Sequence, residues 1–370
     1  MIHLLTKACE RAAGATLKIA CLTPCAERDD SEPAANRRHF LAAASAIAVL
    51  ALLGTDRSSA QQQTVTIAYQ PGADPAKVAQ ADGLYDRVTN WKVNWRRFET
   101  GTEVVAAVMS GDVQIGLVGS SVLAAATSRE LAVQAILVGD LIGEAEALIV
   151  RNGSKIERPE ELKGKTIAVP FVSTTHYSLL ASLKHWSIDP KTVVILNLRP
   201  PEIAAAWERG DIDAAYVWEP ALARIKASGK VLLSSKEVAA FGSPTFDVWI
   251  ARLQFCEKYP EIVTSFVRVT GDAYATYRND PTAWDAKSPQ VAKIARITGE
   301  KPDNIPESLS GRVFPLLSEQ LSPELLGGGL AKAVADTSAF LREQGKIPSV
   351  LSDYAPYISS KFVKAALAPR

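Results

Sequence analysis

A run of hydroxyl side chains stands at the start of an expected helix. Ser173, Thr174, Thr175 and His176 follow the apolar segment 166–170 and precede apolar residues at helical spacing. The first turn of a helix presents free N–H groups and a partial positive charge, so hydroxyls beside it make a socket for a tetrahedral anion. The alternative is that these side chains only cap the helix. The spacing alone does not decide between the two.

Two carboxylates stand where apolar strands are expected. Asp247 interrupts the apolar run 245–251, and Glu219 directly follows the apolar run 214–218. Burial of an unpaired charge is unfavourable, so a carboxylate in such a place needs a partner. For Asp247 the partner is either a structural arginine or backbone N–H group, or a cationic group of a ligand.

These residues occupy related places because the chain repeats itself after about a hundred positions. Residues 66–70 align with 166–170, residues 103–112 with 202–211, and residues 113–124 with 212–223. A repeat of this length covers a whole βαβ assembly and predicts two similar α/β lobes. Ligands of open parallel sheets lie beyond the carboxyl ends of the strands. We therefore expect one ligand between the lobes, with the hydroxyls of Ser120 and Ser121 on one side and the carboxylate of Glu219 on the other.

The elements that position these residues follow from the hydrophobic periodicity. Strands are expected at 65–69, 93–98, 113–118, 133–138, 147–150, 166–170, 193–198, 214–218, 231–233 and 245–251. Helices are expected from Asp74 or Pro75 to Leu84, from 103 to 110, after Ser173, from Glu202, and at 260–277, 288–298 and 323–344. The fold class is therefore α/β, with lobe 1 at 61–146, lobe 2 at 147–246, and a return to lobe 1 with C-terminal helices at 247–370. In this last third we expect packing helices and no catalytic residue.

Residues 1–60 have the pattern of a cleaved export signal. Arg37 and Arg38 precede an uncharged stretch at 42–54, and small residues stand before Gln61. The arginine pair is typical of a twin-arginine signal, and the apolar stretch is shorter than the roughly 20 residues of a membrane span. Cleavage would leave Cys256 as the remaining cysteine, so the mature chain is expected to form no internal disulfide.

The charge of the expected mature chain is balanced. From residue 61 onward the basic and acidic residues are equal in number. Nucleic acids and anionic membranes attract basic surfaces. The composition therefore argues against both as partners.

Several of the segments above together resemble a known family. Residues 119–121, 169–177, 210–211, 218–220 and 246–249 are similar to the substrate-binding proteins of ATP-binding-cassette (ABC) importers for sulfonates, nitrate and taurine. The similarity runs from about Val65 to about Val363. It implies a type II periplasmic binding-protein fold, two α/β lobes with a ligand cleft between them. It also implies a monomer that is not an enzyme, holds no cofactor or metal, and works in the periplasm with a membrane permease and its ATPase.

The resemblance implies taurine, or a related small sulfonate, as the ligand. Taurine carries a sulfonate and an ammonium, and both need partners if both lose water. The expected ligand-binding residues are Tyr69, Gln70, Ser120, Ser121, Thr174, Thr175, His176, Trp218, Glu219 and Asp247. The hydroxyls would hold the sulfonate, and Asp247 the ammonium. His176 either donates to the sulfonate or packs against the strand ends, Glu219 either holds the ammonium or pairs across the closed cleft, and Trp218 and Tyr69 are either cleft walls or core.

An enzyme of the thiamine-pyrimidine synthase type is the alternative from another class. Such enzymes share the fold but are generally cytoplasmic, whereas this chain carries an export signal. The sequence has no Gly-x-Ser-x-Gly, no phosphate-binding loop and no nucleophile with a base at a telling position. A binding protein for other alkanesulfonates is the alternative within the family.

Overall fold

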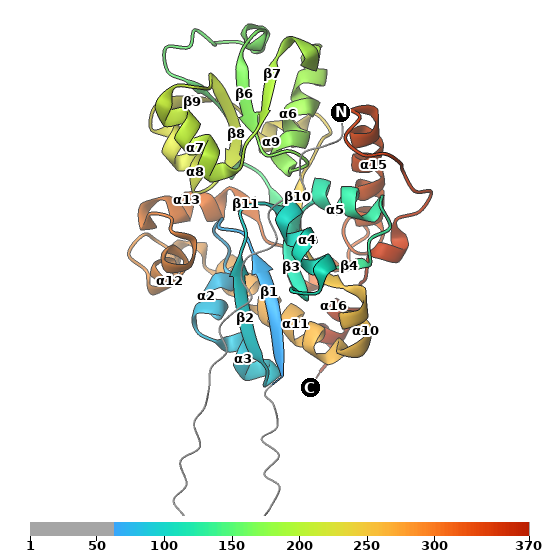
Figure 1. The fold of residues 1–370 in the computed structure, drawn as a ribbon. Coiled ribbons are helices and arrows are strands. Elements are labelled where there is room, and N and C mark those ends of the chain that lie inside the picture. Colours follow the sequence, from blue (N-terminus) through green and yellow to red (C-terminus); the bar gives the residue numbers. More distant parts are fainter. Residues whose placement is uncertain (1–62, 370) are drawn as a thin grey trace, which may run out of the picture. The chain divides into compact units, whose positions relative to one another are not determined.

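The computed structural model describes residues 63–369, so the predicted export signal lies outside the described residues. The described chain contains one sheet of six strands and one of five. Helices pack around each sheet (Figure 1). The six-stranded sheet with its helices forms lobe 1, and the five-stranded sheet with its helices forms lobe 2. The predicted α/β class with two lobes is confirmed.

The sheet of lobe 1 has the strand order β11-β4-β10-β3-β1-β2. Its strands are β1 (Thr64–Tyr69), β2 (Lys92–Arg97), β3 (Ile115–Gly119), β4 (Val133–Ile142), β10 (Phe246–Arg252) and β11 (Arg312–Val313). Strand β1 pairs in parallel with β2 and β3, while β10 runs antiparallel to β3 and β4.

The sheet of lobe 2 has the strand order β7-β6-β8-β5-β9. Its strands are β5 (Glu146–Arg151), β6 (Thr166–Val169), β7 (Val194–Asn197), β8 (Ala214–Trp218) and β9 (Gly229–Ser234). Strand β6 pairs in parallel with β7 and β8, while β5 runs antiparallel to β8 and β9.

The two sheets share one plan, which confirms the predicted repeat. The order β2-β1-β3-β10-β4 in lobe 1 matches β7-β6-β8-β5-β9 in lobe 2. The two lobes also share an equivalent hydrogen bond at the third residue of β1 and the first residue of β6. The amide of Thr66 donates to Oε1 of Gln114 at 2.8 Å, and the amide of Thr166 donates to Oδ2 of Asp213 at 2.9 Å.

The chain crosses between the lobes twice. The first crossing lies between the end of β4 at Ile142 and the start of β5 at Glu146. The second leads from lobe 2 into β10, which starts at Phe246 and enters the sheet of lobe 1 as the sequence predicts. Each crossing therefore feeds the antiparallel strand of the lobe that it enters.

The helices of the structure include the predicted ones, close to their expected bounds and with two corrections, and several short ones that the sequence analysis does not predict. They are α2 (Ala76–Ala81), α3 (Leu84–Thr89), α4 (Gly101–Ser110), α5 (Ser120–Thr127), α6 (Thr174–His185), α7 (Pro200–Arg209), α8 (Ala221–Lys226), α9 (Ser235–Ala240), α10 (Leu253–Lys258), α11 (Pro260–Asn279), α12 (Pro289–Thr298), α13 (Ile305–Ser310), α14 (Leu317–Gln320), α15 (Gly329–Glu343) and α16 (Lys361–Leu367). The single helix predicted from Asp74 or Pro75 to Leu84 is wrong, because Gly83 adopts a left-handed conformation and separates α2 from α3. The helix predicted at 323–344 begins only at Gly329, because Gly328 has a φ of 137° that a helix does not accommodate.

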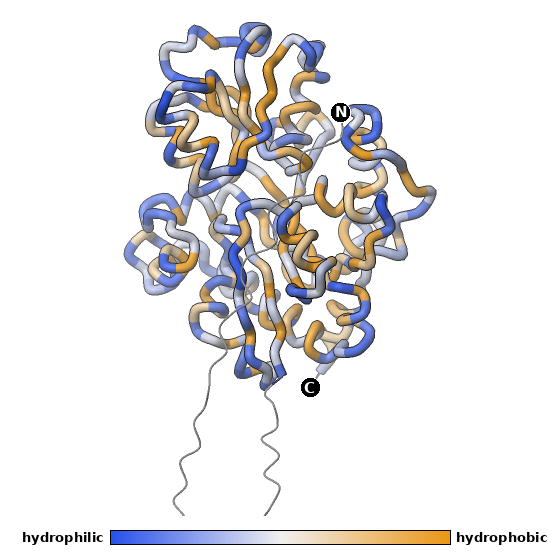
Figure 2. Tube along the Cα trace, viewed as in Figure 1, coloured by the Kyte–Doolittle hydropathy of each residue, from blue (hydrophilic) through white to orange (hydrophobic). Residues whose placement is uncertain are grey.

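The core follows the strands of both sheets. Hydrophobic residues concentrate along the strands, whereas many outer loops are hydrophilic (Figure 2). The fully buried side chains include Tyr85, Trp207, Tyr216, Phe266 and Tyr274. Within residues 63–369, no helix is long and apolar enough to cross a membrane.

Candidate ligand-binding site

A pocket lies between the two lobes and takes its lining from both. Lobe 1 contributes Gln70, Asp74, Gly119, Asp140, Asp247 and Arg312. Lobe 2 contributes Glu146, Ser173, Thr174 and Trp218. The cavity measures about 40 Å³. Since the centre of one water needs about 10–15 Å³, this space holds a few water-sized groups.

The start of α6 forms one wall of the pocket. Ser173 is the N-cap residue, and its hydroxyl accepts a hydrogen bond from the amide of His176 at 3.1 Å. Thr174 lines the pocket and donates its hydroxyl to Oε1 of Glu146 at 2.6 Å. Thr175 lies outside the lining, where its hydroxyl bonds that of Ser173 at 2.8 Å. The helix start predicted from the sequence is confirmed, and Thr174 is the threonine that it turns towards the pocket.

His176 lies behind this wall rather than in it. Its ring stacks on Phe171 with centroids 4.5 Å apart, and its Nδ1 accepts a hydrogen bond from the amide of Val172. Burial, together with the charge of Lys346, lowers the pKa of His176 to about 3. The imidazole is therefore neutral at any ordinary pH.

The start of α5 faces the start of α6. Gly119 is the N-cap residue of α5 and gives no side-chain cap. A Cβ at Gly119 would lie 2.6 Å from Cγ2 of Thr174, so only glycine allows the lobes to approach this closely. Ser120 and Ser121 are buried, and their hydroxyls have no hydrogen-bond partner among the described residues, but neither lines the pocket.

A buried ion cluster forms the lobe 1 side. The Arg312 side chain is 6% exposed, and its Nη1 lies 3.1 Å from Asp140 and 3.1 Å from Asp247. Burial raises the pKa of Asp140 to about 7 even though Arg312 opposes the shift. Burial likewise raises the pKa of Asp247 against the effect of Arg312. The pKa of Arg312 is itself raised, because the two carboxylates outweigh the effect of burial.

Glu146 is the carboxyl that lobe 2 contributes. It is 3% exposed and accepts hydrogen bonds from the hydroxyls of Thr174 and Ser235, at 2.6 and 3.3 Å. Among residues 63–369, no Lys, Arg or His forms an ion pair with it. Burial, followed by the charge of Asp247, raises the pKa of Glu146 to about 8.

Trp218 and Gln70 complete the polar lining. The indole Nε1 of Trp218 is buried and has no hydrogen-bond partner in the described chain. Gln70 donates from Nε2 to the carbonyl of Leu117 at 3.1 Å. Of the sequence-predicted site residues, Gln70, Thr174, Trp218 and Asp247 line the pocket.

The other predicted residues surround the pocket without lining it. These are Tyr69, Ser120, Ser121, Thr175, His176 and Glu219. Tyr69 packs its ring edge-on against Trp95 and lies under Lys77. Glu219 is buried and accepts a hydrogen bond from the amide of Ala223 at 2.9 Å.

Sequence reasoning missed four charged residues of the lining. Asp140 and Glu146 stand beside apolar strand residues, the same signal that identified Asp247. Asp74 precedes α2, and the sequence indicates it only as a possible helix start. Arg312 comes from the last third of the chain, for which only packing helices were expected. It reaches the pocket through the two-residue strand β11, which no periodicity reveals.

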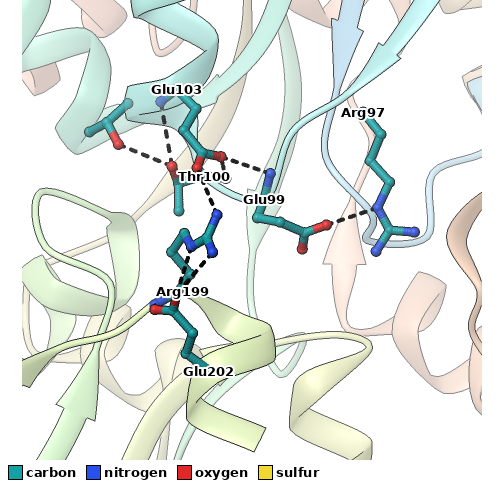
Figure 3. A network of polar contacts seen from close by, with 7 residues as sticks. Arg97, Glu99, Thr100, Glu103, Arg199 and Glu202 are labelled. Carbon is teal, nitrogen blue, oxygen red and sulfur yellow. Dashed lines mark hydrogen bonds and ion pairs between the residues drawn. The ribbon is translucent and has the colours of Figure 1, made fainter. Parts of the chain in front are cut away.

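Ion pairs also join the lobes outside the pocket, and one of them involves two helices that the repeat relates. Arg199, the N-cap residue of α7, lies 2.9 Å from Glu202 and 3.5 Å from Glu103 of α4 (Figure 3). Glu103 also completes a capping box with Thr100. Arg199 therefore links the N-terminal turns of two helices that the repeat relates. Since the side chains are largely exposed, such a pair contributes about 0–1 kcal/mol.

The pocket between two repeat-related sheets defines the class, a two-lobed type II periplasmic binding-protein fold. A family model described as "NMT1/THI5 like" matches residues 71–283, more than half of the chain. The taurine-binding periplasmic protein of Escherichia coli (strain K12) is 46% identical over 88% of this chain and 100% of its own length. The chain belongs to the NMT1/THI5-like family.

Solved structures with a similar fold include both binding proteins and enzymes, so the fold alone does not distinguish the two classes. The alkanesulfonate-binding protein SsuA from Xanthomonas axonopodis pv. citri, bound to MOPS, has a TM-score of 0.67 at 20% identity, covering 80% of this chain and 98% of that one. The desulfurization enzyme DSZB has a TM-score of 0.58 at 14% identity, covering 83% and 99%. The relative at 46% identity decides the class, and the protein is a binding protein rather than an enzyme.

Proposed function

We propose that the protein captures taurine between its two lobes and delivers it to the membrane permease of an ABC importer. The proposal rests above all on the pocket, which brings hydrogen-bond donors and an excess of carboxyl groups within reach of one small ligand. A zwitterion with a sulfonate and an ammonium matches both sets. The relative in Escherichia coli, which this chain covers in full, is named for the same ligand.

The sulfonate lies against the starts of α5 and α6 in this proposal. Gly119 and Thr174 line the pocket at these two helix starts, whose free N–H groups favour an anion. Trp218 Nε1 and Arg312 Nε are buried donors without a partner among the described residues, and both residues line the pocket. The hydroxyls of Ser120, Ser121 and Thr175 lie behind the same wall and support it.

The ammonium lies against the carboxyl groups. Asp247 and Glu146 approach the pocket from opposite lobes, so an ammonium between them contacts both sides. In this proposal Glu219, which is buried next to Trp218 of the lining, stabilises the closed arrangement and does not hold the ammonium. Trp218 covers the two methylenes, with Tyr69 packed farther out.

The size of the pocket favours a small sulfonate. Three or four hydrogen bonds to charged groups contribute roughly 1.5–3 kcal/mol each. After the costs of desolvation and ordering, they support binding in the micromolar range, about −8 kcal/mol. The partners in this proposal are the permease and ATPase of the importer, and the protein acts in the periplasm as a monomer.

Titration calorimetry with taurine, followed by mass spectrometry of the ligand recovered after denaturation, tests the proposal. We expect one site per chain and unchanged taurine. Absence of binding up to millimolar taurine would contradict the proposed ligand. Loss of the sulfonate or amino group from the recovered molecule would contradict the binding role.

A further inference from the structure

The charged groups of the pocket are unequally paired. Asp140 and Asp247 share the guanidinium of Arg312. Asp74 lies in the field of Lys77, which opposes the rise of its pKa on burial. Glu146 has only the hydroxyls of Thr174 and Ser235 as partners. It is therefore the carboxyl of the lining for which the described chain supplies no cation of its own.

The elements packed around Glu146 add no cation at close range. On its own sheet it pairs with Trp218 of β8, and the hydroxyl of Tyr216 on the same strand bonds Ser235. From lobe 1, Asp247 and Asp140 repel its charge and Arg312 attracts it, but Arg312 is already held by these two aspartates. The surroundings therefore favour the neutral, protonated carboxyl when the pocket holds no ligand.

We propose that Glu146 recognises the amino group of the ligand, and that its carboxyl gives up a proton to solvent when a primary ammonium binds. This inference rests on the proposed function. The exchange is balanced: the acid loses one proton, the ligand keeps its ammonium, and the resulting ion pair is neutral. Thr174 and Ser235 hold the carboxylate in place through the hydrogen bonds that already orient the acid.

The same exchange makes Glu146 a specificity residue. An alkanesulfonate without an amino group leaves the acid protonated and releases no proton, so it forgoes the ion pair. Burial raises the pKa of Glu146 to about 8. Below that pH the ionised form required for the ion pair must be created on binding, so taurine affinity rises with pH by up to about tenfold per unit and levels off near pH 8.

The test is calorimetry at pH 6.5 in buffers of different ionisation enthalpy, which counts protons released per ligand bound. For the unmodified protein we expect about one proton with taurine and none with ethanesulfonate. Glu146→Gln keeps the shape of the side chain and one acceptor oxygen, and its NH2 group can only donate, as the O–H of the protonated acid does. This variant should lower taurine affinity at least tenfold while removing the proton release. Glu144→Gln makes the same change two residues earlier at an exposed site and should behave like the unmodified protein.

The outcomes separate the two proposals. Tight taurine binding without proton release, or the same release in Glu146→Gln, would overturn the role of Glu146. No heat with taurine in the unmodified protein would overturn the proposed function and this inference with it. Thermal unfolding of Glu146→Gln, expected at an unchanged or higher temperature, verifies that the variant is folded.

Discussion

Glu146 and Asp247 occupy equivalent positions in the two lobes. Glu146 pairs with Trp218 at the end of β8, and Asp247 pairs with Gly119 at the end of β3. Gly119 and Trp218 are themselves related by the repeat. Each crossing between the lobes therefore ends in a carboxyl that enters the pocket. Their surroundings differ, because Arg312 holds Asp247 while hydroxyls alone hold Glu146.

Asp247→Asn should weaken taurine more than ethanesulfonate. We expect a loss of about tenfold for taurine, the lower end of the roughly 1.5–3 kcal/mol of a hydrogen bond to a charged group, because Arg312 already offsets this charge. Ethanesulfonate should bind no worse, since it has no ammonium to lose a partner. Calorimetric affinities for both ligands decide the matter. An equal loss for the two would make Asp247 a structural residue.

Arg312→Ala should destabilise the folded protein strongly. The change leaves Asp140 and Asp247 side by side in a buried place without a cation, and breaking a buried ion pair costs about 3–5 kcal/mol. Urea unfolding gives the free energy of unfolding. The control is Lys332→Ala, which removes the exposed pair with Asp336 and should cost at most about 0.5 kcal/mol. Equal stability of the two variants would refute the role given to Arg312.

Thr174→Val and Thr175→Val should separate two neighbouring hydroxyls. Thr174 lines the pocket, whereas the Thr175 hydroxyl bonds Ser173 behind it. We expect Thr174→Val to weaken taurine by roughly 1.5–3 kcal/mol and Thr175→Val to change affinity much less. The taurine affinities of the two variants and of the unmodified protein are compared in a competition binding assay. Since the Thr174 hydroxyl donates to Glu146, a larger effect of Thr175→Val would contradict the role given to Thr174 at the pocket.

The sequence predicts the fold well because the fold repeats a pattern of local signals. The strands β1, β3, β6 and β8 are short apolar runs, and Gly111 and Gly210 separate β3 and β8 from the preceding helices α4 and α7. The shared register of the two lobes follows from the spacing of these runs. The site is predicted less completely, because Arg312 enters it through the pairing of β11 with β4, about 170 residues earlier in the chain.

The structure also differs from the sequence prediction in which hydroxyl residues line the pocket. Ser120 and Thr175 have the expected residue types at the expected helix starts, yet neither lines the pocket. Which side of a helix start faces a ligand depends on how two lobes meet, and the close approach of Gly119 to Thr174 sets that here. The hydrophobic pattern of a single helix or strand does not predict this contact between the lobes.

Taurine should draw the two lobes together. Residues of both lobes line the pocket, so a ligand that contacts both stabilises the closed arrangement. Small-angle X-ray scattering should give a smaller radius of gyration at saturating taurine. Arg199→Ala removes the contact with Glu103 and should weaken taurine only slightly, since this pair is exposed. An unchanged radius on binding would count against closure.

The most direct test of a zwitterion site is the affinity of the mature protein for taurine and for ethanesulfonate, measured by calorimetry under the same conditions. The two ligands share the sulfonate and the two carbons and differ in the amino group. We predict that taurine binds in the micromolar range and at least tenfold more tightly, because only taurine offers the carboxyl groups of the pocket a cation. Equal affinity for the two ligands would contradict the account.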